Sequence, residues 1–309
     1  MKVDILIPNY NGASLLVKNL GSVLASLEPR NGEIIIVDDG STSEDLQVLE
    51  QAVQENQARV RLIKHKTNKG FSSAINTAAS HSKADYIVLL NSDVSPSQNF
   101  LDSPIKKLEE DPSLFGVGCM DRSHEADRIV ERGRGIGKWN RGMLIHSKGD
   151  VDSTDTFWIS GGSCIIRRKF FVDLGGMDEI LNPFYWEDID LSYRAQKAGY
   201  RILFDKESVV SHFHEEGSIK KNISKNSVTT TAYRNQLIFI WKNITNYHLL
   251  INHLLWLPVH IVGALKRGDT NFFAGLFLAV IKLPAIIVRR QKQRRFYKIS
   301  DLEIIQNIS

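Results

Sequence analysis

The sequence is poor in cysteine, with only Cys119 and Cys164 among its 309 residues, each inside an apolar run. This excludes a disulfide framework and a paired-cysteine metal site, so we expect buried thiols in a reducing compartment. The first residues lack the apolar stretch of a signal peptide, which predicts that folding begins in the cytoplasm. With 42% hydrophobic and 24% charged residues, the composition excludes a disordered or fibrous protein. It leaves room for one large α/β domain and an appendage.

Several motifs of nucleotide-binding and nucleophilic enzymes are absent as well. There is no Gly-x-x-x-x-Gly-Lys phosphate loop. The stretch GRGIG at Gly133–Gly137 lies in a polar segment, without a strand before it or a helix after it, so it is not a dinucleotide fingerprint. The SGGS stretch at 160–163 lacks the partner residues of a nucleophile elbow. These absences leave carboxylates as the main candidates for chemistry.

Apolar strands alternate with helical patterns in the first part of the chain. The runs VDILIP, EIIIVDD, RVRLIKH and DYIVLLNSD have the composition of strands buried in a parallel sheet. Since strand–helix–strand units with short connections form right-handed crossovers, the sequence predicts an α/β fold. We expect a Rossmann-like, mostly parallel sheet flanked by helices. We also predict a helix over about 95–111 and a long, charged, glycine-bearing loop over 121–156.

Polar residues follow four of these strands at the point where each strand ends. In open α/β sheets, ligands bind in the crevice outside the carboxyl ends of the strands. We therefore predict a binding site at this edge of the sheet, formed by Asn9, Asn11, Asp38, Asp39, Asn68, Lys69, Asn91 and Asp93.

The stretch FYWEDIDLSYRAQKAGYRI, from Phe184 to Ile202, places three carboxylates just ahead of a helix. Glu187, Asp188 and Asp190 could cap the first turn and complement the helix dipole. A carboxylate in this place could instead be held ready to accept a proton from a substrate. The local pattern alone allows both readings.

The chain resembles a family-2 glycosyltransferase of the GT-A fold, closest to the rhamnosyltransferase-like bacterial group. The resemblance covers about residues 3–218 and rests on ordered motifs, namely IPNYNG, VDDGSTSED, TNKGFSSAIN, LLNSDV, SGGSCIIRR and GGMDEILNPFYWEDIDLSYRAQKAGYRI. It implies a catalytic domain over 1–218, with a nucleotide-sugar half at about 1–95 and an acceptor half at about 96–218. A C-terminal helical region would follow over 219–309.

The resemblance implies an inverting transfer from a nucleoside-diphosphate sugar, helped by Mn²⁺ or Mg²⁺. Asp188 would be the general base, with Glu187 beside it, and Asp93 would bind the metal. Asp38 and Asp39 would contact the base and ribose, and Lys69 would lie near the diphosphate. The implied nucleotide-sugar set is Pro8, Asn11, Asp38, Asp39, Asn68, Lys69, Asn91 and Ser92. The implied acceptor or sugar pocket is Gly161, Gly162, Tyr185 and Trp186, although the two aromatic residues could equally belong to the core.

The metal motif departs from the family pattern, because Asn91 occupies the first position of the Asn91–Ser92–Asp93 triplet. A neutral amide there reduces the charge offered to a cation and points to another ligand. His212 is the leading candidate and His214 is the alternative.

The C-terminal third is apolar with scattered polar residues. The 17-residue run at 272–288 is interrupted by Lys282 and Pro284 and is short for a spanning helix. The run at 249–265 carries Asn252 and two histidines and is less plausible still. Followed by the basic segment RRQKQRR, these runs favour interfacial helices on the cytoplasmic membrane surface. A helical cap on the catalytic domain or an oligomer interface is the alternative.

The resemblance implies transfer of a single sugar, from dTDP-rhamnose or a UDP-sugar, in cell-surface polysaccharide assembly. The acceptor would be a glycan or a lipid-linked glycan, and we expect no nucleic-acid partner. Arg132 and Arg134 are candidates to bind acceptor phosphates. The main alternative is a catalytically idle sugar-nucleotide-binding scaffold at the membrane. A nucleotidyltransferase would need a glycine-rich activation loop, and a processive synthase would carry several spanning helices and a Gln-x-x-Arg-Trp motif.

Overall fold

The computed structural model describes residues 1–125, 128–212 and 223–306. Its strands are β1 (Val3–Asn9), β2 (Ile34–Asp38), β3 (Val60–Lys64), β4 (Tyr86–Leu90), β5 (Val94–Pro96), β6 (Leu114–Glu125), β7 (Arg128–Arg132), β8 (Gly135–Asn140), β9 (Met143–Lys148), β10 (Ser163–Arg167) and β11 (Arg201–His212). Its helices are α1 (Ala13–Leu27), α2 (Ser43–Glu55), α3 (Phe71–His81), α4 (Asp102–Glu110), α5 (Arg168–Asp173), α6 (Glu187–Lys197), α8 (Lys225–Asn243), α9 (Tyr247–Arg267), α10 (Thr270–Ile281), α11 (Leu283–Arg294) and α12 (Asp301–Gln306), with a 3-10 turn η1 (Glu179–Leu181).

A nine-stranded mixed sheet forms the centre of the molecule, in the order β3-β2-β1-β4-β10-β6-β11-β5, with β7 paired to β6. The first four strands in this order are parallel, as their continuous apolar runs predict. Strand β10 is antiparallel to both of its neighbours, and β6 and β11 are again parallel. The predicted α/β fold is confirmed, and the second half of the sheet mixes the two strand directions.

Helices cover both faces of this sheet because successive side chains of a strand point to opposite sides. In β1, Ile5 and Ile7 join a core with helices α1, α2 and α4. The intervening Leu6 joins a second core with α3, α5 and α6. Both cysteines are buried free thiols within these cores, as expected. Burial raises the pKa of Cys119 to about 12.

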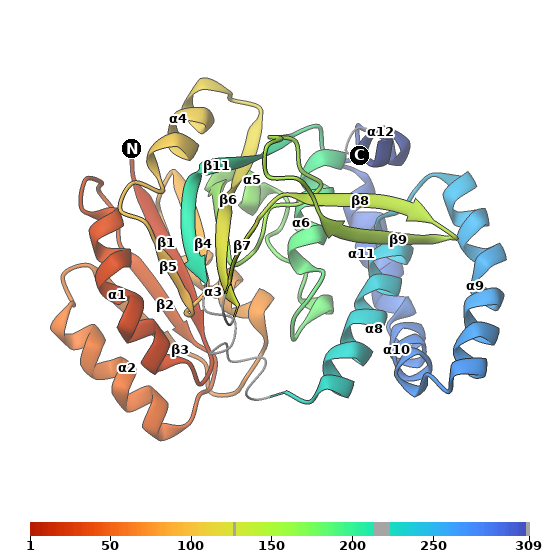
Figure 1. The fold of residues 1–309 in the computed structure, drawn as a ribbon, viewed down its shortest axis with the longest axis horizontal. Helices are drawn as coiled ribbons and strands as arrows, with labels where there is room; N and C mark the ends of the chain where they lie inside the picture. The colour runs from red at the N-terminus through yellow and green to blue at the C-terminus, as the bar shows by residue number, and fades with distance from the viewer. Residues whose placement is uncertain (126–127, 213–222, 307–309) are drawn as a thin grey trace.

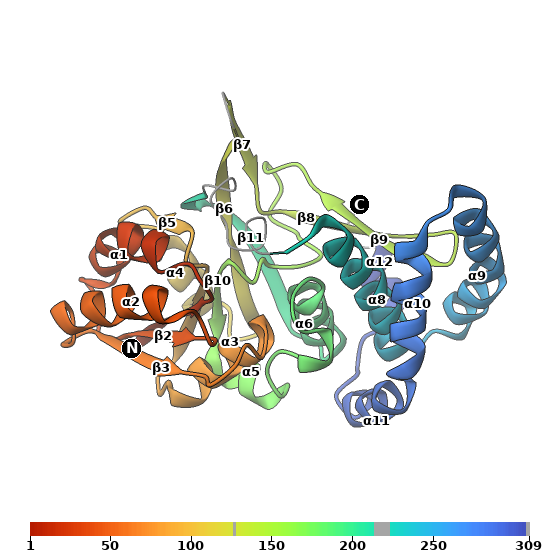
Figure 2. The same cartoon turned by 90° about the horizontal axis from the view of Figure 1, so that it is seen from below.

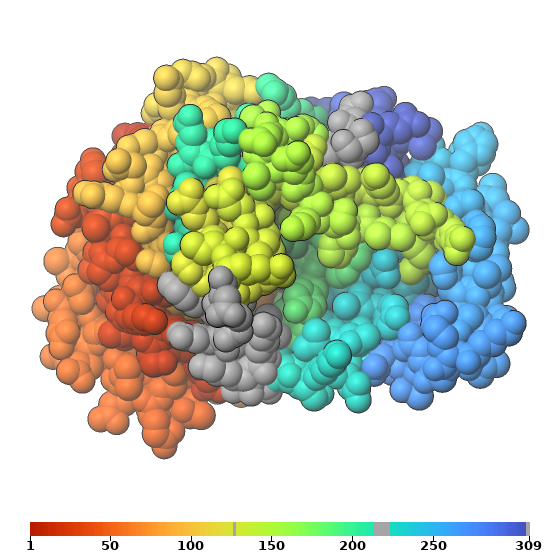
Figure 3. All heavy atoms as spheres, in the orientation of Figure 1, coloured from red at the N-terminus to blue at the C-terminus, as the bar shows by residue number. Residues whose placement is uncertain are grey.

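The C-terminal helices form the other end of the molecule, at the right of Figure 1 and of the space-filling view in Figure 3. They share a third core with β9 and α6, in which Trp186 and Tyr193 pack with Phe239. The β8–β9 ribbon reaches across to α9, where Trp139 Nε1 donates a 2.9 Å hydrogen bond to Asn252 Oδ1.

Two predicted segments differ in the structure. The charged stretch 121–156 was expected as a loop, but most of it forms strands: the end of β6, β7, and the β8–β9 ribbon. Cross-strand ion pairs stabilise the ribbon formed by β6 and β7, including the pair of Arg122 and Glu131 at 3.2 Å. Figure 2 shows that β7 projects from the body of the molecule. The helix predicted from about 95 begins only at Asp102, because Val94–Pro96 pairs with β11 as strand β5.

Candidate functional site

A cavity of about 390 Å³ opens at the carboxyl ends of β1, β2 and β4, where the polar residues of these strands were expected to meet. The far side of the cavity is formed by the segment before β10, by the loop that leads into α6, and by the end of β11. Its lining residues are Pro8, Asn9, Tyr10, Asp39, Asn68, Gly70, Phe71, Ala74, Asn91, Ser92, Asp93, Ser160, Gly161, Gly162, Pro183, Phe184, Tyr185, Glu187, Asp188, His212 and Ile223.

The two aspartates at the end of β2 occupy different positions. Asp39 lines the cavity, and its carboxylate accepts hydrogen bonds from the backbone N–H groups of Lys69 and Gly70. His65 Nδ1 lies 2.6 Å from the same carboxylate. Asp38 is not among the lining residues; it is buried and bonded to Asn9 Nδ2 at 3.0 Å. The structure therefore brings Asp39 to the cavity surface and places Asp38 beneath it.

Two further residues of the predicted nucleotide set lie outside the cavity lining. Asn11 holds the turn after β2, since its Oδ1 accepts a 2.9 Å hydrogen bond from the Thr42 N–H group. The Lys69 side chain is exposed, and only its backbone is used by Asp39. Its neighbours Asn68 and Gly70 do line the cavity.

Asp93, in the turn between β4 and β5, meets His212 at the end of β11 in the cavity, with 3.2 Å between Asp93 Oδ2 and His212 Nε2. The other ring nitrogen, Nδ1, lies 3.1 Å from Asp121 Oδ2. Burial alone would lower the pKa of His212, but Asp121 and Asp93 outweigh burial and raise it to about 9. His214, the alternative ligand, lies outside the described residues.

This pair fits one edge of a divalent-cation site. In an octahedral site, adjacent ligand atoms about 2.1 Å from the cation lie about 3 Å apart, which matches the separation of the two atoms. Mg²⁺ is commonly held by one or two protein groups, with substrate phosphates and water completing the site. The described residues contain no cluster of three or more side chains arranged as metal ligands, so the protein offers only a partial coordination shell.

The three carboxylates at the start of α6 separate into two groups. Glu187 and Asp188 line the cavity. Asp188 accepts hydrogen bonds from its neighbour Ile189 at 2.7 Å and from the Gly161 N–H group at 3.3 Å. Asp190 is fully buried on the other side of the helix, where its carboxylate contacts Arg194 at 2.8 Å. Asp190 is therefore part of the core, and the other two carboxylates face the site.

Burial changes the proton affinity of the two cavity carboxylates. It raises the pKa of Asp188 from its usual value, although N–H donors from Ile189 and Gly161 offset part of this. Burial, and then the Asp188 charge, raises the pKa of Glu187 well above its usual value. Among the described residues, Glu187 Oε2 is buried without a hydrogen-bond partner. Of the two, Glu187 therefore has the more strongly raised pKa, and Asp188 has the N–H donors that favour its ionised form.

The two aromatic residues before α6 point to opposite sides. Tyr185 is 40% exposed and lines the cavity. Trp186 is buried in the third core against Phe239 and His146, so it is a core residue and does not reach the site. Gly161 and Gly162 lie at the cavity as predicted.

The structure adds residues that the sequence did not single out for the site, including Tyr10, Phe71 and Pro183. Their side chains match no catalytic or metal-binding pattern, so a pattern search cannot find them. Asn9 had such a signal at the end of β1. It is 1% exposed, lines the cavity, and its Oδ1 has no hydrogen-bond partner among the described residues.

The two arginines expected at acceptor phosphates are occupied by the protein itself. Arg132 pairs with Glu125 on the β6–β7 ribbon. Arg134 is buried, and its guanidinium lies 2.7 Å from Asp155. These contacts do not support a phosphate-binding role for either side chain.

Known proteins of similar sequence and fold give independent information. The chain is 27% identical over 220 residues to the pre-mycofactocin glycosyltransferase of Mycobacterium tuberculosis, which covers 69% of this chain and 43% of that protein. The chain thus spans less than half the length of that relative.

Two solved structures share the fold. GalNAc-T7 with UDP, GalNAc and Mn²⁺ has a TM-score of 0.62 at 18% identity, covering 78% of this chain and 48% of that chain. Staphylococcus aureus TarS 1–349 with UDP-GlcNAc has a TM-score of 0.59 at 14% identity, covering 99% and 90%. At these identities the likeness concerns the fold alone, and it confirms the predicted GT-A fold with C-terminal helices.

The sequence itself identifies the family. The model of glycosyl transferase family 2 matches residues 4–175, which is more than half of the chain and reaches from β1 to β10. The chain therefore belongs to glycosyl transferase family 2.

Proposed function

We propose that this chain is an inverting glycosyltransferase that moves a single sugar from a nucleoside-diphosphate sugar to a glycan or lipid-linked glycan acceptor. The observation that carries the proposal is one cavity lined both by the Asp188 carboxylate and by the Asp93–His212 pair. A base for the acceptor and a cation site for the leaving group are the two parts that such a transfer requires.

In the proposed reaction Asp188 is the general base. It accepts the proton of the acceptor hydroxyl as the acceptor oxygen forms a bond to the anomeric carbon. The bond from that carbon to the diphosphate oxygen breaks at the same time, and the nucleoside diphosphate leaves with the electron pair. Attack from the face opposite the leaving group inverts the anomeric centre. The raised pKa of Asp188 suits a base that works near neutral pH.

Donor binding is assigned to the ends of β1, β2 and β4. Asp39 is held by backbone N–H groups and faces the cavity, so its carboxylate can accept an N–H group of the base. Asn9 belongs to the same wall of the cavity, and its Oδ1 has no hydrogen-bond partner among the described residues. Asp38 and Asn11 stabilise these strand ends through their hydrogen bonds with Asn9 and Thr42. The remaining proposed donor contacts are Pro8, Asn68, Lys69, Asn91 and Ser92.

Asp93 and His212 would hold Mn²⁺ or Mg²⁺. When bound, the cation supplies a positive charge that neutralises the departing diphosphate. Asp121 fixes the orientation of the His212 ring through Nδ1 and leaves Nε2 directed at Asp93. GalNAc-T7 was solved with UDP and Mn²⁺, and TarS with UDP-GlcNAc, which supports a metal and a nucleotide-sugar donor. The leading donors remain dTDP-rhamnose and UDP-sugars.

We further propose that the C-terminal helices bring the enzyme to the inner face of the cell membrane, in cell-surface polysaccharide assembly. Among the described residues, α9 alone has the length and hydropathy of a spanning helix, and α10 with α11 would qualify only as a pair bent by 63°. The outer surface of these helices exposes Ile251, Leu254, Leu255, Val259, Val262, Leu265, Phe277, Val280, Ile281, Ile287 and Val288. Basic residues follow in α9 and α11, which suits an anionic interface.

The first experiment is thermal stabilisation of the purified protein by dTDP, UDP and GDP, each with manganese and with EDTA. A ligand that binds only the native state raises the melting temperature by mass action. We expect one nucleotide to stand out and its effect to disappear in EDTA. Absence of any shift with all three nucleotides would contradict the proposed donor site.

A further inference from the structure

The loop that forms the acceptor-side wall of the cavity has an unusual backbone. Tyr185 and Trp186 have φ angles of 69° and 74°, so two consecutive bulky residues adopt the left-handed conformation. Such conformations are strained for bulky residues and persist only where the surrounding structure enforces them. The two conformations send Tyr185 to the cavity and Trp186 to the core, and they start α6 with Asp188 at the site.

Helix α8 supplies the contacts that enforce this backbone. The Asn235 Nδ2 group donates hydrogen bonds to the carbonyl oxygens of Leu181 at 2.6 Å, Phe184 at 3.0 Å and Tyr185 at 2.8 Å. Asn235 is fully buried. The neighbouring Arg234 is 9% exposed and donates to the Leu181 and Asn182 carbonyls. Two polar side chains of α8 therefore bind the backbone of the whole loop.

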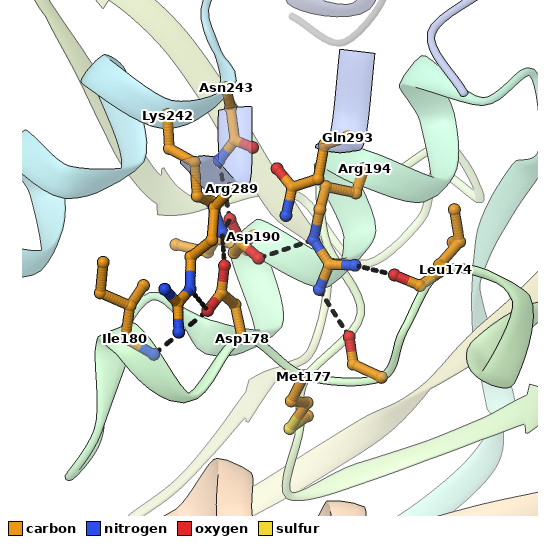
Figure 4. Close-up of polar contacts among 12 residues, drawn as sticks. Leu174, Met177, Asp178, Ile180, Asp190, Arg194, Lys242, Asn243, Arg289 and Gln293 are labelled. Atoms are coloured by element: carbon orange, nitrogen blue, oxygen red, sulfur yellow. Dashed lines mark hydrogen bonds and ion pairs between the residues drawn. The ribbon is translucent and has the colours of Figure 1, made fainter. Parts of the chain in front are cut away.

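The same helix contacts α6 two turns further along. Residues seven or eight positions apart lie on one face of a helix. Accordingly, Lys242 Nζ lies 2.6 Å from both Asp178 and Asp190, and Asn243 Nδ2 donates to Asp190 at 2.7 Å. Figure 4 shows Lys242 and Asn243 on one side of Asp190, with Arg194 on the other. Helix α8 thus holds both the loop and the helix that carries Asp188.

We propose that Asn235, assisted by Arg234, is a positioning residue for the sugar and acceptor side of the site. It keeps the loop 181–186 in the one conformation that places Tyr185 and Asp188 at the cavity. This inference rests on the proposed transferase function for its effect on sugar binding, but the loop contact itself does not. Helix α8 lies outside the segment matched by the family model, so these contacts are a feature of this chain's C-terminal region.

The test compares Asn235→Ala with the matched control Gln236→Ala. Gln236 is the next residue of α8, and its Nε2 donates to the Leu144 carbonyl of β9 instead of the loop. Hydrogen exchange is measured on both full-length variants, together with binding of UDP, dTDP and GDP and of UDP-glucose, UDP-GlcNAc, dTDP-rhamnose and GDP-mannose in manganese. Slow hydrolysis of the sugar nucleotides reports on the site without a known acceptor.

For Asn235→Ala we expect amides of 182–190 to exchange at least about tenfold faster, while the strands of the sheet keep their protection. The nucleoside diphosphate should bind within about twofold of the parent value, because the hydrogen bonds of the Asn235 amide group end at Leu181, Phe184 and Tyr185 and not at the proposed donor residues. Binding of the matching sugar nucleotide should weaken, and its hydrolysis should slow, about tenfold or more. Gln236→Ala should behave like the parent protein in all of these measurements.

Arg234→Lys is the milder variant if Asn235→Ala does not fold, since it keeps Asn235 and the positive charge while disturbing the guanidinium contacts with Leu181 and Asn182. It should show the same pattern with smaller changes. Unchanged loop exchange in the folded variant would overturn the inference, as would equal weakening of nucleotide and sugar nucleotide. Faster loop exchange in a protein whose parent binds no nucleotide would instead leave the positioning contact standing and refute the proposed function.

Discussion

Glu187 and Asp188 are adjacent carboxyl groups that share one buried cavity, and their environments give them different roles. Asp188 receives two N–H donors, whereas Glu187 Oε2 has no partner among the described residues. These environments favour the protonated form of Glu187 and the ionised form of Asp188. When two titratable neighbours are separated in this way, the ionised one is the base.

Replacing each of the two carboxylates by its isosteric amide should change the rate of sugar transfer by different amounts. Asp188→Asn removes the base and should lower transfer by about 10²–10⁴-fold. Glu187→Gln imitates a carboxyl group that is already protonated, so transfer should stay within about tenfold of the parent rate. The nucleotide-induced thermal shift should survive in both variants. Normal transfer by Asp188→Asn would remove the base assignment, and an absence of transfer in the parent protein would favour an idle scaffold.

Glu187 should also make the stability of the protein depend on pH. Its folded-state pKa is raised, so its contribution is complete below the unfolded value of about 4.3 and is lost as pH rises toward the folded value. Glu187→Gln should therefore match the parent near pH 4 and become more stable above it, by about 1.4 kcal/mol per unit of pKa difference. Urea denaturation at several pH values measures this, and a constant difference would contradict it.

At this scale the sequence predicts residue types well and side-chain directions poorly. The motif does not distinguish Asp38 from Asp39 as ligand-binding residues. Strand β2 ends between them, so Asp38 faces the core and Asp39 faces the cavity. Tyr185 and Trp186 could not be distinguished for a similar reason. Their directions follow from two left-handed backbone conformations that α8 enforces from another part of the chain.

Among the elements, the N-terminal strands were predictable because continuous apolar runs of four to eight residues have few alternative interpretations. The β6–β7 ribbon was not predictable, since it projects from the body and its residues alternate weakly. It is held by charged pairs such as Arg122 and Glu131, which in a sequence resemble an ordinary solvated loop. Polar cross-strand pairing is visible only when the partner strand is known.

Helix α9 provides an element-scale test of membrane contact. Leu254 and Leu255 are 64% and 70% exposed, so Leu254→Gln with Leu255→Gln should leave the fold intact. Burying a leucine side chain in a bilayer is worth about 1.5–3 kcal/mol. Binding to sedimented vesicles of phosphatidylcholine and phosphatidylglycerol should therefore fall at least about tenfold.

The matched control for this experiment is Val17→Gln with Val48→Gln, two exposed valines on α1 and α2 at the opposite end of the molecule. These substitutions remove a smaller exposed apolar surface, since the valines are 37% and 46% exposed, and should not change vesicle binding. Equal binding by the α9 variant and the parent would rule out α9 as the membrane contact.

For the whole molecule, the sequence predicts a boundary near residue 218, with a catalytic domain before it and a helical region after it. The structure shows how closely the two parts are joined. The third core takes Trp186 and Tyr193 from the first part and Phe239 from the second. Buried ion pairs also connect the two parts, because Lys242 of the second part contacts the carboxylates of Asp178 and Asp190 in the first. Burial would raise the pKa of Asp178, but Lys242 and its other cationic neighbours lower it instead.

These contacts predict that the chain unfolds as one cooperative unit. Lys242→Met leaves two buried carboxylates short of a partner, which typically costs about 3–5 kcal/mol. The exposed Lys266→Met is the matched control and should change stability by less than about 0.5 kcal/mol. A chain ending at residue 218 loses both the cation and the core partners of Trp186, so it should show no cooperative thermal transition and no nucleotide-induced shift. Calorimetry distinguishes the alternatives: two separate transitions in the full chain, or a truncated chain that melts like the parent, would show that the parts fold independently and that α8 is not needed to form the site.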